Sequence, residues 1–222
     1  MSALADNIRA LKQKVPGSVK IVAVSKNRTV EEILEVYQSG HRIFGENKVQ
    51  ELLTKKEKLP ADIEWHLVGH LQTNKVKYVV PFVSMIQSID SMKLLSLVNR
   101  EASGYGRIVP CLLQIHIGSE ETKYGFRPDD LRQILDSGSL GDLNNIRICG
   151  VMGLATFTGD ETVIRREFRF LADYFRDLKS NYFNANQYFT EISMGMSGDF
   201  GIAIEESSTL IRIGTLIFGE RN

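Results

Sequence analysis

Short apolar runs rich in β-branched residues alternate along the chain with stretches of helical period. Strands are expected at residues 19–25, 41–45, 63–68, 83–89, 108–117, 146–151, 188–192 and 210–213. Helices are expected at residues 29–40, 48–58, 74–79, 91–103, 128–137, 162–179 and 197–206, and an extra amphipathic helix at residues 1–14. This alternation predicts parallel βαβ units.

Eight strands of this kind fit two architectures, a closed TIM-type (β/α)8 barrel or an open doubly wound sheet. The number of strands favours the barrel. An open sheet that binds a nucleotide usually carries a glycine-rich turn after its first strand, whereas residues 25–29 read Ser-Lys-Asn-Arg-Thr. No linker or low-complexity segment interrupts the pattern, so residues 1–222 are expected to form one domain.

Composition narrows the possible partners. The chain has 27 Lys plus Arg and 27 Asp plus Glu, and this balance argues against a general nucleic-acid or anionic-membrane binder. Uncharged stretches reach only about a dozen residues, short of the roughly 20 of a membrane span, and the first helix lacks the apolar core of a signal peptide. Cys111 and Cys149 lie in apolar runs and are expected to be buried free thiols. We therefore expect a cytoplasmic protein.

Lys26 is the first candidate for chemistry, because the carboxyl ends of the strands carry the functional residues of such a barrel. It directly follows the first predicted strand. Partial desolvation at a barrel mouth lowers the pKa of a lysine and favours the free amine, which can form a Schiff base with a carbonyl compound. The alternative is an ordinary solvated loop lysine.

Two turns could bind a phosphate group. Residues 193–198 read Ser-Met-Gly-Met-Ser-Gly after the seventh predicted strand, and Gly214-Thr215 follow the eighth. Small residues and hydroxyls at these positions of a barrel offer backbone N–H donors to phosphate. Both segments could also be ordinary tight turns. In the same mouth as Lys26, they suggest a phosphorylated carbonyl compound as the ligand.

Arg212 lies within the apolar run of residues 210–213, where strand alternation turns it toward the barrel interior. A buried arginine must be paired or hydrogen-bonded. It could donate to a ligand, or it could pair with one of the carboxylates Glu46, Glu191 and Glu220.

The histidines give a weaker signal. His66 and His70 are four residues apart, but at the end of a strand this spacing does not bring two imidazoles together as it does on a helix. No third ligand is evident, so no metal site is expected.

Five motifs together resemble one known family. They are AVSK at residues 23–26, FGEN at 44–47, WHLVGHLQTNK at 65–75, SMGMS at 193–197 and RIGTLIFGER at 212–221. In this order, and over nearly the whole chain, they resemble the pyridoxal phosphate homeostasis protein family. The chain departs from the usual family pattern at Gly198, where an acidic residue is common, and at Leu216, where alanine is common.

The resemblance implies a barrel like the N-terminal domain of alanine racemase, with pyridoxal 5′-phosphate held by Lys26 as an internal aldimine. It implies that the phosphate lies at the turn of residues 193–197 and at Gly214-Thr215, that Arg212 faces the ring nitrogen, and that Asn47 lies near the ring. The expected cofactor-binding residues are Lys26, Asn47, Met194, Ser197, Arg212, Gly214 and Thr215.

The resemblance further implies a monomeric carrier in vitamin B6 homeostasis, without catalytic turnover, whose partners include apo-forms of pyridoxal-phosphate enzymes. An alternative is a pyridoxal-phosphate-dependent amino-acid racemase, although the sequence ends soon after the eighth strand and leaves no room for a racemase-type β-domain. Lys123 or Tyr124 would then have to serve as the opposing base. A Schiff-base aldolase that uses Lys26 without a cofactor is a third, weaker hypothesis.

Overall fold

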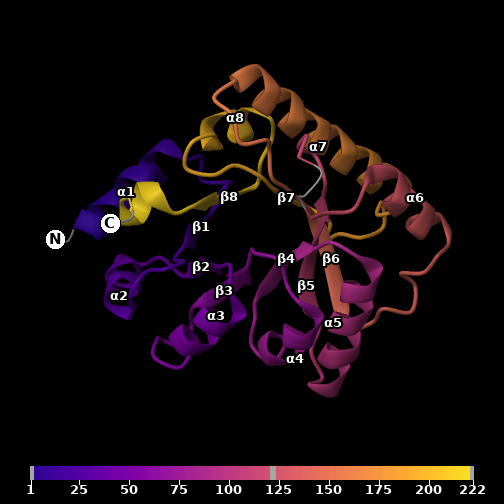
Figure 1. The fold of residues 1–222 in the computed structure, drawn as a ribbon, viewed down its shortest axis with the longest axis horizontal. Helices are drawn as coiled ribbons and strands as arrows, with labels where there is room; N and C mark the ends of the chain where they lie inside the picture. The colour runs from indigo at the N-terminus through magenta and orange to yellow at the C-terminus, as the bar shows by residue number, and fades with distance from the viewer. Residues whose placement is uncertain (1–2, 121–123, 221–222) are drawn as a thin grey trace.

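The eight strands close into a parallel barrel in sequence order, β1 to β8, with β8 paired to β1. The structure is a computed structural model that describes residues 3–120 and 124–220 (Figure 1). The helices lie on the outside of the strands (Figure 1). The barrel, rather than the open doubly wound sheet, is therefore confirmed.

The strands are short and lie close to their expected positions. They are β1 (Lys20–Val24), β2 (Ile43–Glu46), β3 (Glu64–Leu67), β4 (Met85–Ile89), β5 (Val109–Ile115), β6 (Ile146–Gly153), β7 (Glu191–Ser193) and β8 (Leu210–Ile213). The expected strand at 188–192 begins three residues late. The Asn186 side chain accepts from the Tyr188 N–H at 2.9 Å, a local turn that delays strand pairing.

The helices follow the strands as expected, with differences at their ends. They are α1 (Ala3–Lys14), α2 (Val30–Gln38), α3 (Val49–Lys56), α4 (Val76–Val79), α5 (Met92–Gly104), α6 (Pro128–Asp136), α7 (Glu161–Asn181), α8 (Phe200–Glu205) and α9 (Thr215–Phe218), with a short 3-10 turn η1 (Thr73–Lys75) before α4. The capping box of Thr29 and Glu32 begins α2.

One helix begins later than expected, and one further helix was not expected. The helix expected from residue 197 begins at Phe200, because residues 197–199 form a turn. The short helix α9 was not expected, since four residues carry no usable periodicity. It lies beside α1 (Figure 1), where Asn7 Nδ2 donates to the Ile217 carbonyl at 3.0 Å. No helix in the described ranges is long and apolar enough to cross a membrane.

The core has two layers. A large outer cluster lies between strands and helices and includes Ile211 and Ile213 of β8. A small inner cluster fills the barrel with Val22, Met85, Leu112, Cys149, Met152 and Leu210. The alternation along β8 therefore turns Arg212 to the same side as Leu210, as expected. Cys111 and Cys149 are buried and not bonded to each other, which confirms the expected free thiols.

Candidate functional site

Lys26 lies in the turn that directly follows β1, and its side chain is partly buried. The turn is anchored to the next strand, because the Ser25 N–H donates to the Gly45 carbonyl at 3.0 Å. Asn27 then adopts a left-handed conformation with φ of 60°, which asparagine tolerates better than most residues. Lys26 is thus placed at the carboxyl end of the barrel, between an ordered strand end and a sharp turn.

The strand order brings the other candidate segments next to this turn. β1 is hydrogen-bonded to β8 on one side and to β2 on the other, with Ala23 opposite Ile213 and Val24 opposite Gly45. A Cβ added at Gly214 would lie 3.3 Å from the Val24 carbonyl oxygen, so the loop after β8 passes close to β1. Asn47 directly follows β2 and is partly buried. Sequence-distant candidates therefore meet at one mouth.

The turns after β7 and β8 present unused backbone donors. Among the described residues, no acceptor receives a hydrogen bond from the N–H groups of Ser197, Gly198, Gly214 and Thr215. The Met196 N–H differs, because it donates to the Asp199 carboxylate. Thr215 is exposed, while Ser197 and Gly214 are partly buried. The two neighbouring turns therefore offer several N–H groups and two hydroxyls to an anion.

Met194, also expected among the cofactor-binding residues, lies inside the fold. Its side chain is fully buried in the outer core cluster. Its N–H donates to the Leu210 carbonyl at 3.2 Å, and its own carbonyl accepts from the Ser208 hydroxyl at 2.8 Å. Both backbone groups are therefore engaged inside the fold, and Met194 positions the turn rather than offering a polar contact.

Arg212 begins a chain of polar side chains that crosses the barrel interior, which we call the interior chain: Arg212, Ser193, Gln87 and His66. Arg212 Nη1 donates to Ser193 Oγ at 2.5 Å, and Arg212 Nη2 donates to the Gly153 carbonyl at 2.8 Å. Ser193 Oγ donates to Gln87 Oε1 at 2.7 Å, and Gln87 Nε2 lies 2.8 Å from His66 Nδ1. The chain thus links β8 to β3.

The charge of the interior chain resides on Arg212 alone. No carboxylate within the described ranges forms a salt bridge with Arg212, so pairing with Glu46, Glu191 or Glu220 is not what the structure shows. Burial lowers the pKa of Arg212 to about 10, against the opposing effect of Asp199, and the guanidinium stays charged at neutral pH. Burial lowers the pKa of His66 to about 3, so its imidazole is neutral. An arginine without a carboxylate therefore lies below the mouth.

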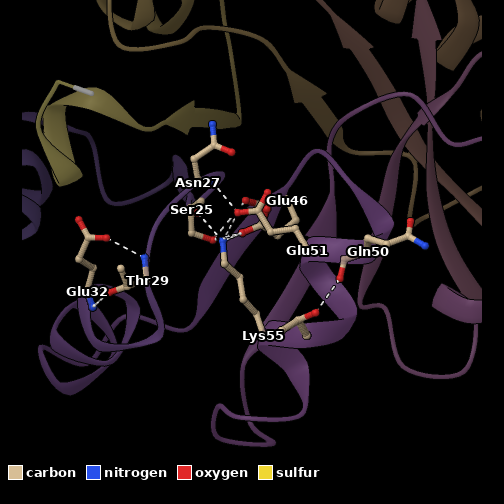
Figure 2. Close-up of polar contacts among 10 residues, drawn as sticks. Ser25, Asn27, Thr29, Glu32, Glu46, Gln50, Glu51 and Lys55 are labelled. Atoms are coloured by element: carbon tan, nitrogen blue, oxygen red, sulfur yellow. Dashed lines mark hydrogen bonds and ion pairs between the residues drawn. The ribbon is translucent and has the colours of Figure 1, made fainter. Parts of the chain in front are cut away.

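A second buried group, which we call the β2–α3 cluster, surrounds the backbone at Lys26: Ser25, Glu46, Glu51 and Lys55 (Figure 2). Lys55 Nζ lies 2.7 Å from Glu46 Oε1 and 2.6 Å from Glu51 Oε1, and it donates to the Ser25 carbonyl at 2.6 Å. Ser25 Oγ donates to Glu46 Oε1 at 2.6 Å. The sequence motifs included Ser25 and Glu46, whereas Lys55 and Glu51 were missed.

The histidines do not meet. His66 points into the barrel, whereas His70 Nδ1 lies 2.9 Å from Asp90 Oδ2 and its ring stacks on Tyr124 with centroids 3.7 Å apart. Among the described residues, no three His, Cys, Asp or Glu side chains are grouped to hold a metal. Lys123, considered as an opposing base, lies outside the described residues.

Both the sequence and the fold of the chain are similar to those of known proteins. The profile of the family described as "Alanine racemase, N-terminal domain" matches residues 1–222. The chain is 38% identical over 203 residues to a "Pyridoxal phosphate homeostasis protein" of Aquifex aeolicus, covering 91% of this chain and 87% of that one. A human protein with the same description is 36% identical over 214 residues, covering 91% of this chain and 77% of that protein.

This chain belongs to the pyridoxal phosphate homeostasis protein family. A solved structure of PipY of Synechococcus elongatus without PLP superposes on this chain with a TM-score of 0.92 at 35% identity, and the match covers 97% of this chain and all of PipY. The structure of PipY described as having PLP bound gives a TM-score of 0.89. An alanine racemase of Clostridium difficile shares the fold at 13% identity, with a TM-score of 0.77, and this chain spans 56% of its length.

Proposed function

We propose that the chain binds pyridoxal 5′-phosphate through Lys26 and holds it for delivery, as a cofactor carrier in vitamin B6 homeostasis. The observation that carries the proposal is the placement of a lysine amine, unused backbone donors and a buried guanidinium on the three adjacent strand ends of β1, β7 and β8. The family membership and the PipY structure described with PLP support the same ligand.

The residues fit the three functional groups of this cofactor. When bound, the aldehyde condenses with a primary amine: the Lys26 nitrogen bonds to the aldehyde carbon and water leaves. The N–H groups at Ser197, Gly198, Gly214 and Thr215 suit a phosphate, because they have no partner in the described fold and do not require a basic surface. A chain with balanced charge can hold an anion locally in this way.

Arg212 would face the pyridine nitrogen, with Asn47 near the ring. A guanidinium has donors and no acceptor, so the ring nitrogen beside it must accept the hydrogen bond and carries no proton of its own. An unprotonated ring is a weaker electron sink for carbanion chemistry. Arg212 is anchored by Ser193 and Gly153, which holds its remaining donors in a fixed orientation. These features favour a carrier over a racemase.

We propose that residues 1–222 form one cofactor-binding domain and that the chain works as a monomer in the cytoplasm, where its buried cysteines stay reduced. Its macromolecular partners would be apo-forms of pyridoxal-phosphate enzymes, which receive the cofactor.

The decisive experiment is an absorption spectrum of the purified protein before and after adding pyridoxal phosphate. We expect a visible band that borohydride abolishes, with the reduced adduct mapped to Lys26 by mass spectrometry, and no band in Lys26→Ala. A protein that stays colourless after reconstitution would contradict the proposal. Transfer to an apo-enzyme tests carriage, and sustained solvent-deuterium exchange at the α-carbon of added amino acids would favour the racemase alternative.

A further inference from the structure

The β2–α3 cluster surrounds Lys26 without including it. Glu46 ends β2, while Glu51 and Lys55 lie one helical turn apart on α3 and face the end of β1 (Figure 2). Ser25 and Asn27, the residues on either side of Lys26, receive the contacts. The cluster therefore acts on the backbone at Lys26.

The contacts fix both peptide planes that bound Lys26. The Ser25 carbonyl, which accepts from Lys55 Nζ, belongs to the plane before Lys26. The Asn27 N–H, which donates to Glu51 Oε1 at 2.5 Å, belongs to the plane after it. Because peptide units are planar, fixing the two planes fixes φ and ψ of the residue between them. The direction of the Lys26 Cα–Cβ bond is then determined.

Lys55 is the centre of this arrangement. An ammonium group has three N–H donors, and those of Lys55 are matched by three acceptors, on Glu46, Glu51 and Ser25. The Lys55 side chain is 6% exposed and that of Glu46 is fully buried. Burying such a pair is costly, and well-packed apolar residues of similar size often give equal or greater stability. Stability alone is thus a poor reason for this cluster.

Glu46 adds a second observation. Its Oε1 accepts from both Ser25 and Lys55, whereas its buried Oε2 has no hydrogen-bond partner among the described residues. One oxygen of the carboxylate therefore accepts both hydrogen bonds, on the side of the residue before Lys26. The other oxygen contributes no hydrogen bond within the described residues. Such an arrangement is expected for an orientation constraint rather than for maximal pairing.

We propose that Lys55, through Glu46 and Glu51, is a positioning residue that orients the Lys26 amine for condensation with an aldehyde. The inference rests on the proposed function for the identity of the aldehyde, but the orientation itself is a property of the protein without ligand. Lys55 acts on the peptide units on either side of Lys26, directly at the Ser25 carbonyl and through Glu51 at the Asn27 N–H.

The test compares Lys55→Met, which removes the ammonium and keeps an unbranched side chain one atom shorter, with Lys20→Met as a control. Lys20 forms an ion pair of 2.5 Å with Glu191 at the opposite end of the same strand. We expect Lys55→Met to weaken pyridoxal phosphate binding about tenfold or more, since small displacements of reacting groups have effects of this order. Lys20→Met should leave it unchanged.

A second readout needs no cofactor. The unliganded protein is treated with an acylating reagent, and the labelling rate of Lys26 is expressed relative to that of the exposed Lys93 in the same sample. Freeing the turn should raise this ratio about threefold or more in Lys55→Met, in proportion to greater local opening. Global unfolding would instead raise labelling at the partly buried Lys75 and Lys179 as well, which the same spectra reveal.

If Lys55→Met does not fold, Glu51→Ala decides, because it removes the contact to Asn27 from a partly exposed position. A higher Lys26 labelling ratio in that variant supports the proposal. An unchanged ratio in the variant that folds, or an equal change in Lys20→Met, overturns it. A wild-type protein that never binds pyridoxal phosphate would contradict the proposed function, while the labelling ratio would still decide this inference.

Discussion

The two buried polar groups of this barrel differ in how they handle charge. The β2–α3 cluster gathers one cation and two carboxylates around a stretch of backbone. The interior chain holds one cation, Arg212, and passes its hydrogen bonds to neutral side chains as far as His66. The first pairs its cation with carboxylates of its own, whereas the second keeps a guanidinium whose charge no carboxylate in the described fold neutralises.

This difference assigns different tasks to the two sides of the mouth. A residue that only orients another group can form all its ion pairs within the protein, as Lys55 does with Glu46 and Glu51. A residue that binds a ligand must keep N–H donors that have no acceptor in the protein, as Arg212 and the turns after β7 and β8 do within the described residues. Variants that alter one group at a time can break or sharpen this contrast, and their expected effects decrease in the order given below.

The largest effect is expected from Glu46→Gln in the β2–α3 cluster. The substitution breaks the buried ion pair between Glu46 and Lys55 and leaves the ammonium with Glu51 as its one carboxylate partner in the cluster, which costs about 3 kcal/mol of unfolding free energy at neutral pH. Urea denaturation measures the loss. In the double variant with Lys55→Met, at least half of it should return, because the buried cation that lost its Glu46 partner is gone. A Glu46→Gln protein as stable as wild type would show that the cluster is not ionic.

Acid should destabilise the interior chain. The pKa of His66 falls from an ordinary 6.5 to about 3 in the fold because of burial. The unfolded chain then binds the proton more readily between these values, so the stability of the fold is lost as pH falls below 6.5. The contribution is about 2 kcal/mol between pH 7.5 and pH 5, at roughly 1.4 kcal/mol per unit.

The comparison of wild type with His66→Asn isolates this contribution, since the asparagine amide does not titrate. The difference in unfolding free energy between the two proteins should shrink by that amount as pH falls. Glu46 contributes in the opposite sense. Burial raises its pKa, so the folded state binds the proton at a higher pH than the unfolded chain does. Its contribution to the unfolding free energy therefore rises as pH falls. A pH-independent difference between wild type and His66→Asn would contradict the neutral state of His66.

Breaking the interior chain at its middle should cost less. Ser193→Ala removes the hydroxyl that accepts from Arg212 and donates to Gln87, and leaves two buried polar atoms without that partner. We expect a loss of about 1.5 kcal/mol in unfolding free energy. Pyridoxal phosphate binding should also weaken, because Arg212 loses an anchor. The control Ser137→Ala removes an exposed hydroxyl and should change neither measurement.

How much of the fold and of the site could be predicted from the sequence depends on how far apart in the sequence the interacting residues lie. The strand order and the inward position of Arg212 follow from local period, and both are confirmed. The partners of Arg212 come from β6 and β7, and no pattern within β8 specifies them. Lys55 and Glu51 show only the i, i+4 spacing of many surface helices. Their role depends on how α3 packs against the end of β1. This packing is tertiary structure, which the local sequence of α3 does not specify.

The smallest change in stability is expected at the mouth itself. Thr215 is exposed, and Thr215→Val removes a hydroxyl that has no partner in the described fold, so the unfolding free energy should change by less than about 0.5 kcal/mol. If the hydroxyl donates to the phosphate, pyridoxal phosphate binding should weaken about fivefold, the value of one hydrogen bond. The control is Thr54→Val, an exposed threonine on α3. An unchanged affinity in Thr215→Val would remove the hydroxyl from the proposed site and leave the backbone N–H groups to bind the phosphate.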